Sequence, residues 1–299
     1  MKKIIALALA TLMVLSLFAG CAAAGGEKAE AQYTVTGKFK DTKVATVTEG
    51  KLTVAISPDF APMEFVDPTK TGQDMFVGFD PILAKYIAEE LGLELEIMPM
   101  DFDACQAAVA TGKVHMSISG FSWLPEREEN YNLSDYYYAG DNETEQVLIT
   151  TKENAGKFTT VESMAGLKVG AQAASLQEGL CKEQLPNNEL VVYTDINTGV
   201  LQLKKGDFQI MAVATGNADA IIAANPDLAL AGFEFDVSEE ESNNLILLKK
   251  GNDQLTAEVN KILAKAYEAG KYGEWYAKAE ELAGIGVEIS YDENGNPIT

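Results

Sequence analysis

The chain has 299 residues, enough for two ordinary domains, and 47% of them are hydrophobic, so it can bury a core. Its 45 acidic residues against 23 basic ones give a formal net charge of −22, which repels both nucleic-acid phosphates and anionic lipid. One histidine, His115, and three cysteines exclude a multi-histidine zinc site and a disulfide framework. We therefore expect no nucleic-acid partner, no metal and no cofactor, and we expect Cys105 and Cys181 to be free, buried thiols.

The N-terminus has the layout of an export signal. Lys2 and Lys3 precede an almost continuous apolar run, residues 4–18, which is too short for a comfortable membrane span. The run ends in small residues before Cys21 and resembles the bacterial lipobox, whose cysteine receives a diacylglycerol anchor. The alternative is an ordinary cleaved signal followed by an accidental cysteine.

This interpretation sets the compartment. Residues 1–20 are expected to be a signal peptide with a lipobox, and residues 21–49 a lipidated N-terminus and flexible tether of low apolar periodicity. A lipid on Cys21 would hold the protein at an outer membrane face. The expected location is therefore extracytoplasmic, lipid-anchored at the cell membrane.

The first part of the remaining chain alternates between strand and helix patterns. Asp80 followed by Pro81 predicts a helix start, and Gly92 predicts its end. The predicted elements, in order, are a strand at 52–56, a helix at 80–91, a strand at 93–98, a helix at 103–111 and a strand at 114–118.

The alternation begins again in the second part. Ser175 and Glu178 have the spacing of a capping box and predict a helix start. The predicted strands are 167–171, 190–193, 208–213 and 245–249, and the predicted helices are 175–185, 199–205, 255–269 and 272–283. Such alternation predicts parallel sheets covered by helices, with a ligand at the carboxyl ends of the strands or in a crevice between lobes.

Several short motifs occur in an order that resembles a known family. They are residues 57–65, 77–80, 112–120, 125–127, 133–137, 166–170 and 258–261. Together, over about residues 50–285, they resemble the extracellular solute-binding proteins of polar amino-acid ABC importers, family 3. The order of the motifs makes the resemblance specific, although each motif alone is weak.

The resemblance implies an α/β, two-lobed periplasmic-binding-protein-like fold of type II, with two hinge strands and a ligand cleft between the lobes. It implies a first lobe of residues 50–143 plus 244–299 and a second lobe of residues 144–243. The hinges are expected near Glu143–Val147 and Asn243–Ile246.

Arg127 is the first candidate for ligand binding. A guanidinium can grip a carboxylate through two parallel, charge-assisted hydrogen bonds. The resemblance implies this role toward a ligand's α-carboxylate. The alternative is a surface arginine paired with Glu126 or Glu128.

Ser119, Gly120 and Ser122 are expected around the same site. The resemblance implies that the backbone near Gly120 accepts from the ligand's amine, while Ser122 and nearby amides contact the carboxylate. A plain turn after a strand is the alternative.

On the second lobe, Ser175 and Leu176 stand where the family completes the carboxylate clamp. Leu176 has no hydroxyl, so only its amide can contribute, and Ser175 could serve only as a helix cap. Phe60 and Phe102 are expected either against the ligand's side chain or in the core. Ser57 stands where binders of basic amino acids tend to carry an acid, so its neutrality argues against lysine or arginine as the ligand.

The main departure from the family lies at Ala214, where an aspartate usually holds the ligand's ammonium. Either Glu64, Asp219 or a nearby group replaces it, or the ligand lacks a free α-amine. A slip of the alignment by a few residues is the third possibility.

The expected function is a monomeric, non-enzymatic capture receptor that delivers a carboxylate-bearing solute to an ABC transporter permease. The expected ligand is a neutral, polar or aromatic amino acid or an analogue of one. One alternative is a dehydratase of the same fold acting on a cyclic carboxylate, which would need a general acid in the cleft. The other is a sensory ligand-binding subunit, which sequence does not separate from a transport receptor.

Overall fold

The computed structural model describes residues 50–137 and 145–284, together with the backbone of four short terminal strands. These strands are β1 (Ala31–Thr34), β2 (Lys43–Thr46), β16 (Ser290–Tyr291) and β17 (Pro297–Ile298). The predicted signal peptide, Cys21 and most of the predicted tether lie outside the described residues. The pair β1–β2 lies within that predicted tether, where tyrosine, threonine and valine favour extended backbone.

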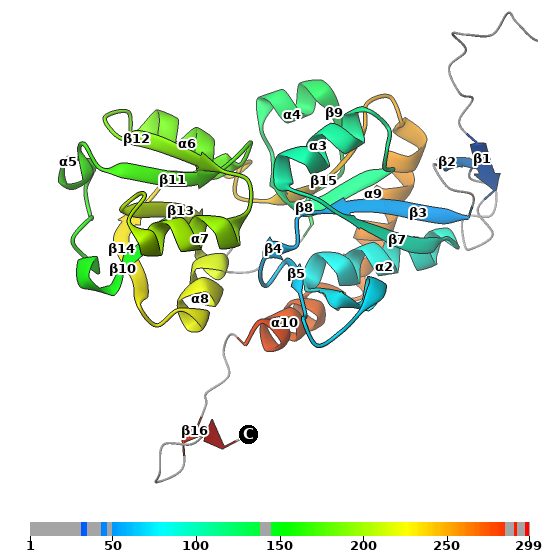
Figure 1. Cartoon of the computed structure of the whole chain (residues 1–299). Coiled ribbons are helices and arrows are strands. Elements are labelled where there is room, and N and C mark those ends of the chain that lie inside the picture. The colour runs from blue at the N-terminus through cyan, green and yellow to red at the C-terminus, as the bar shows by residue number, and fades with distance from the viewer. Residues whose placement is uncertain are drawn as a thin grey trace, which may run out of the picture. The chain divides into compact units, whose positions relative to one another are not determined.

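The first lobe is built on a five-stranded sheet of order β7-β3-β8-β15-β9 (Figure 1). Its strands are β3 (Lys51–Ile56), β7 (Glu94–Pro99), β8 (Met116–Ser122), β9 (Tyr131–Leu133) and β15 (Asn244–Lys249). Strand β3 is parallel to β7 and β8, whereas β15 runs antiparallel to β8 and β9. The last of these strands comes from far along the sequence, so the chain leaves this sheet and returns to it.

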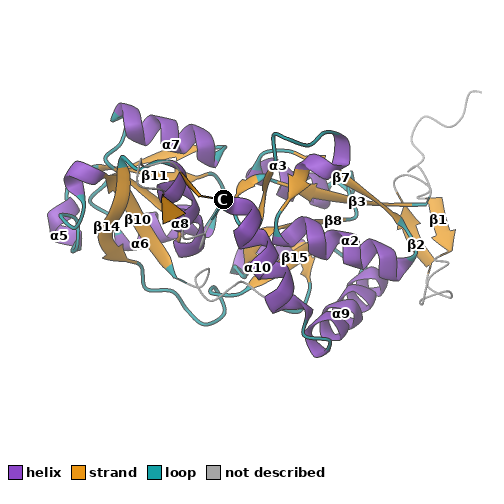
Figure 2. Ribbon diagram, turned by 90° about the horizontal axis from the view of Figure 1, so that it is seen from below, coloured by secondary structure: helices purple, strands orange, loops and turns teal. Residues whose placement is uncertain are grey.

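Helices cover both faces of this sheet. They are α2 (Phe79–Leu91), α3 (Phe102–Ala110), α4 (Pro125–Asn130), α9 (Asp253–Glu268) and α10 (Lys271–Ala283). Figure 2 shows α2, α9 and α10 gathered together, and their apolar faces share one buried cluster with β3 and β8. Helix α3 belongs to a separate cluster on the opposite face.

A small antiparallel sheet follows β3 and leads into α2. It contains β4 (Asp59–Phe60), β5 (Glu64–Val66) and β6 (Phe76–Val77), with the short 3-10 helix η1 (Gly72–Met75) before β6. Gly78 joins it to α2 at a φ of 119°, and a Cβ there would lie 2.3 Å from the carbonyl oxygen of Met63. Only glycine fits this approach, which fixes β5 against the start of α2.

The second lobe is built on a sheet of order β12-β11-β13-β10-β14. Its strands are β10 (Gln146–Thr151), β11 (Lys168–Gln172), β12 (Glu189–Tyr193), β13 (Ile210–Ala214) and β14 (Leu228–Glu234). Its helices are α5 (Val161–Met164), α6 (Leu176–Gln184), α7 (Ile196–Lys205) and α8 (Thr215–Ala224), with the 3-10 helix η2 (Lys152–Asn154). Two buried clusters, on α7–α8 and on α6, cover the two faces.

This architecture confirms the predicted α/β, two-lobed fold class. The chain passes from the first sheet to the second between Tyr137 and Gln146 and returns between Glu234 and Asn244. Part of the first predicted hinge, residues 143–144, lies outside the described residues. The lobe boundaries themselves stay a prediction.

Several element boundaries differ from those predicted. Strand β8 continues to Ser122, beyond the predicted end at residue 118, because β15 pairs with it there. Helix α7 begins at Ile196, before the predicted residue 199, because Asp195 caps it by accepting from the amide of Thr198 at 2.8 Å.

The predicted cap at Asp80 is also wrong. Gly78 precedes α2, and the carboxylate of Asp80 turns instead toward the amide of Gly120 at 3.0 Å and the hydroxyl of Tyr137 at 3.1 Å. A carboxylate can accept hydrogen bonds from residues distant in sequence as well as from the first turn of its own helix. The sequence does not show which distant donors the fold brings near.

The two remaining cysteines, Cys105 and Cys181, are free and buried, as predicted. Burial raises the pKa of each thiol to about 12, so neither is a reactive thiolate near neutral pH. Among the helices that the structure describes, none is both long and apolar enough to cross a membrane.

Candidate functional site

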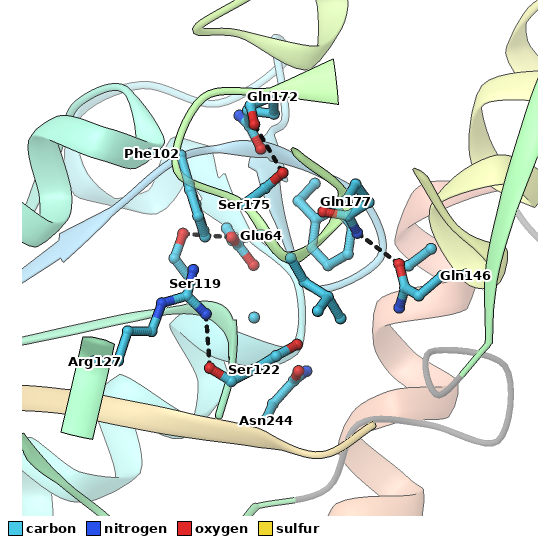
Figure 3. Close-up of a pocket in the computed structure, with 14 residues that line it drawn as sticks. Glu64, Phe102, Ser119, Ser122, Arg127, Gln146, Gln172, Ser175, Gln177 and Asn244 are labelled. Carbon is cyan, nitrogen blue, oxygen red and sulfur yellow. Dashed lines mark hydrogen bonds between the residues drawn. The ribbon is translucent and has the colours of Figure 1, made fainter. Parts of the chain in front are cut away.

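A cavity that offers about 30 Å³ to the centres of water molecules is lined by residues of both lobes (Figure 3). The first lobe contributes Phe60, Glu64, Phe102, Ser119, Gly120, Ser122, Arg127 and Asn244. The second lobe contributes Gln146, Gln172, Ser175, Leu176, Gln177 and Ala214. The carboxyl ends of β8, β11 and β13 all meet here, which is where ligands bind in open α/β sheets.

Arg127 is a buried cation in this cavity. Only 1% of the residue is exposed, although α4, which carries it, is otherwise on the surface. Its Nη1 donates to the carbonyl of Ser122 at 2.6 Å, its Nη2 donates to the carbonyl of Ala174 on the other lobe at 2.8 Å, and its Nε has no acceptor. The guanidinium carbon lies 5.2 Å from the ring centroid of Phe121.

No carboxylate in the described residues forms an ion pair with Arg127. The alternative of a surface arginine is therefore wrong, since Glu126 and Glu128 are exposed while Arg127 is buried. Burial lowers the pKa of Arg127 to about 10, which still leaves it charged at neutral pH. A buried charge without a counter-ion is costly, and an anion entering the cavity would offset that cost.

Ser119 and Gly120 lie within β8, and both donate hydrogen bonds to buried acids. The hydroxyl of Ser119 donates to Oε1 of Glu64 at 2.5 Å, and the amide of Gly120 donates to Asp80. Gly120 has a φ of 56°, and a Cβ there would lie 2.9 Å from the ring of Phe60. A glycine is therefore required where the backbone approaches the cavity.

Glu64 and Asp80 form a buried acid pair at this side of the cavity. Both residues are 0% exposed, and Glu64 lines the cavity. Burial, followed by repulsion from Asp80, raises the pKa of Glu64 well above its ordinary value, and burial raises that of Asp80 to about 7. The Oε2 of Glu64 and the Oδ1 of Asp80 have no hydrogen-bond donor, so we infer that the pair holds at least one proton at neutral pH.

Ser175 caps α6, as one of its two predicted roles requires. Its hydroxyl accepts from the amide of Glu178 at 3.1 Å and donates to the carbonyl of Gln172 at 2.7 Å. It also lines the cavity with Leu176 and Gln177, the first two residues of α6. Their amides have no acceptor inside the helix and therefore favour an anion.

The aromatic candidates occupy different surroundings. Phe60 lines the cavity and packs against buried clusters of both lobes. Phe102 also lines it, but stacks on Phe121 with ring centroids 4.7 Å apart. Ser57 is buried and does not line the cavity, and its hydroxyl donates to Oδ1 of Asp59 at 2.9 Å.

Ala214 lies at the cavity wall, where β13 ends and α8 begins. Asp219 lies further along α8 and does not line the cavity. Among the described residues of the second lobe, no carboxylate lines the cavity. The acid in the described lining is Glu64, which belongs to the first lobe.

Four amide side chains in the lining were not predicted: Gln146, Gln172, Gln177 and Asn244. Figure 3 shows Gln177 directed toward Gln146, to which its Nε2 donates at 2.6 Å. The Nδ2 of Asn244 has no acceptor. Gln146 begins β10, Gln172 ends β11 and Asn244 begins β15, so only the order of strands in the sheets could have indicated their proximity.

The family profile of the bacterial extracellular solute-binding proteins, family 3, matches residues 52–279. The chain belongs to this family. Its membership agrees with the two-lobed fold and with a cavity between the lobes, and it gives this family 3 protein an extracytoplasmic location.

Named relatives bind amino acids. The arginine-binding extracellular protein ArtP of Bacillus subtilis is 31% identical over 74% of this chain and 82% of its own length. The L-cystine-binding protein TcyJ of Escherichia coli is 26% identical over 80% of this chain and 84% of its own. This family 3 protein is therefore a relative of amino-acid-binding proteins of ABC transporters.

Solved structures show the same relationship. The substrate-binding protein AbpA of Streptococcus pneumoniae, bound to L-arginine, is 35% identical with a TM-score of 0.72, covering 78% of this chain and 96% of its own. An ancestral arginine-binding protein bound to glutamine is 29% identical with a TM-score of 0.69, covering 77% and 98%. Related structures thus hold both a cationic and a neutral amino acid.

Proposed function

We propose that the chain is the substrate-binding lipoprotein of an ABC importer and captures a neutral, polar amino acid by closure of its two lobes. The observation that supports this most is the charge distribution of one cavity: the buried guanidinium of Arg127 and the buried acid Glu64 both line it. A zwitterion offers one carboxylate and one ammonium to two such groups.

The carboxylate of the ligand binds Arg127, whose Nε lacks an acceptor, and the first amides of α6 from the other lobe. Because those donors come from both lobes, the bound anion stabilises the closed arrangement more than the open one. Ligand-driven closure requires this differential affinity.

The ammonium of the ligand binds at Glu64 in place of the aspartate that the family carries at the position of Ala214. Glu64 is the acid and Arg127 the cation among the described lining residues, so the lining offers one group to each charge of a zwitterion. The amide side chains of Gln146, Gln177 and Asn244 suit a polar ligand side chain.

A second candidate is a cationic amino acid, which the arginine-bound relatives favour. An additional positive charge at the acid pair would displace its shared proton. Binding of L-arginine would then release a proton, whereas binding of a neutral amino acid would not.

Calorimetry tests the two candidates. Unliganded protein is titrated with L-glutamine and L-arginine in two buffers of different ionisation enthalpy, after a thermal-shift screen of the twenty amino acids. We expect neutral polar amino acids to bind with no net proton exchange. Preferential binding of arginine with proton release would replace our ligand assignment, and binding of none of the twenty would overturn the proposal.

The same samples separate binding from catalysis. Mass spectrometry of the ligand after prolonged incubation is expected to recover it unchanged. A cyclic carboxylate that is bound and then dehydrated would favour the enzymatic alternative.

A further inference from the structure

Asp59, in β4 of the first lobe, is bonded to the second lobe. Its Oδ2 accepts from the backbone amide of Ile196 at 2.7 Å and from Nε2 of Gln172 at 3.0 Å. Its Oδ1 accepts from the hydroxyl of Ser57 in its own lobe. The residue is 8% exposed, so these bonds lie in a buried contact between the lobes.

The contact includes the start of α7. Ile196 is the first residue of this helix, and its amide has no acceptor within the helix. Asp195 satisfies the amide of Thr198, so the two aspartates from different lobes cap the same first turn. Burial raises the pKa of Asp59 to about 7, so the carboxyl is partly ionised at neutral pH, and its ionised form also interacts favourably with the helix dipole.

Two neighbours of Asp59 extend the contact. Phe60 packs against the buried cluster of α7 and α8 in the second lobe, and Nδ2 of Asn217 in α8 donates to the carbonyl of Ala61 at 3.1 Å. Asp59, Ala61 and Asn217 do not line the cavity. Gln172 and Phe60 also line the cavity, whereas the bonds from Ile196 to Asp59 and from Asn217 to Ala61 join the lobes outside the ligand site.

We propose that Asp59 is a positioning residue that holds the lobes closed independently of any ligand contact, and that it thereby sets how long a ligand stays bound. The bond to α7 can form only when the lobes are together, so it contributes to the closed state alone. Its loss should therefore accelerate release without changing ligand encounter in the open state. The statement about release rests on the proposed capture function, whereas the statement about closure does not.

The test compares Asp59→Ala with Asp67→Ala. Asp67 is a matched control, because its carboxylate accepts only within its own loop, from Thr69 and from Lys70. Small-angle X-ray scattering of the ligand-free proteins reports closure, and stopped-flow measurements with L-glutamine report association and dissociation.

We expect Asp59→Ala to increase the radius of gyration of the ligand-free protein and to make L-glutamine dissociate about tenfold faster, the effect of losing the hydrogen bonds from Ile196 and Gln172. The association rate should stay within about twofold, since Asp59 does not touch the ligand. Asp67→Ala should match the wild type in all three quantities.

Asp59→Asn keeps the size of the side chain and serves if the alanine variant does not fold. The asparagine side chain retains an oxygen that can accept from Ile196 but loses the carboxylate charge. We therefore expect smaller increases in the radius of gyration and in the dissociation rate than in Asp59→Ala. Scattering and dissociation both equal to the wild type in a folded variant would overturn the inference. If L-glutamine does not bind the wild type, the proposed ligand fails while the scattering comparison still decides the role of Asp59.

Discussion

At the scale of single residues, Arg127 combines full burial with an unsatisfied donor. We expect Arg127→Ala to abolish ligand-induced thermal stabilisation, because removing one partner of a buried charge pair costs about 3–5 kcal/mol. Glu126→Ala is the control, since this neighbour is exposed, and it should bind as the wild type does. Equal affinity in the two variants, measured by calorimetry, would refute the carboxylate clamp.

Gly120 is constrained both by its backbone and by a neighbour. Gly120→Ala places a residue at positive φ and a Cβ against the ring of Phe60. Gly72→Ala is a matched control, because its φ is 64° but a Cβ there meets nothing within 4 Å. We expect Gly72→Ala to lower the free energy of unfolding, measured in urea, by only the backbone cost of about 1 kcal/mol. Gly120→Ala should lower it by more, because its Cβ also meets Phe60, and should bind the ligand more weakly.

The acid pair makes stability depend on pH. The pKa of Asp80 is about 7 in the folded protein, above its ordinary value of 3.8, so the folded state holds this proton more tightly than the unfolded state. Its contribution is greatest at low pH and is lost as pH rises through about 7. Urea midpoints between pH 5 and 8 should fall less steeply in Asp80→Asn than in the wild type, and identical slopes would contradict the assignment.

At the scale of secondary-structure elements, α7 shows how a local signal and a tertiary contact act together. Asp195 was not identified from the sequence as a cap, yet it fixes the first turn that Asp59 contacts. We expect Asp195→Ala to reduce the free energy of unfolding by about 1 kcal/mol, the usual cost of losing a cap. Asp207→Ala, exposed just beyond the other end of α7, should leave it unchanged, and equal urea midpoints for the two variants would deny Asp195 this role.

The elements also explain which parts of the fold were predictable. Periodicity predicted α2, and Ser175 predicted the start of α6, because an amphipathic face and an N-cap are local properties. Strand β8 was predicted too short, since its last residues are extended only by pairing with β15, which follows more than a hundred residues later.

At the scale of the whole molecule, the proposed anchor determines where capture takes place. Cys21→Ser removes the thiol that a lipid would modify and should move the protein from the membrane fraction to the medium or periplasm. A variant of Cys105, which is buried and free, controls for loss of a thiol as such and should stay with the membrane. Membrane association of Cys21→Ser in cell fractionation would rule out lipidation as the anchor.

Sequence patterns were enough to predict the family, the two-lobed α/β class and a group of candidate residues in the first lobe. They were enough because strand and helix periodicity are local, and because the segment from Gly112 to Arg127 places its motif residues close together along the chain. All the predicted ligand-binding residues except Ser57 line one cavity, and their binding of a ligand stays a prediction.

The chemistry of the opposite cavity wall and the contact between the lobes became visible only in the folded chain. Folding brings Gln146, Gln172 and Asn244 to the cavity from separate strands, and it pairs Glu64 with Asp80. It also directs Asp59 to the amide of Ile196, which lies 137 residues further along the chain. Burial and long-range pairing are properties of the packed chain, so no local pattern encodes the raised pKa of an acid or the partner of a carboxylate.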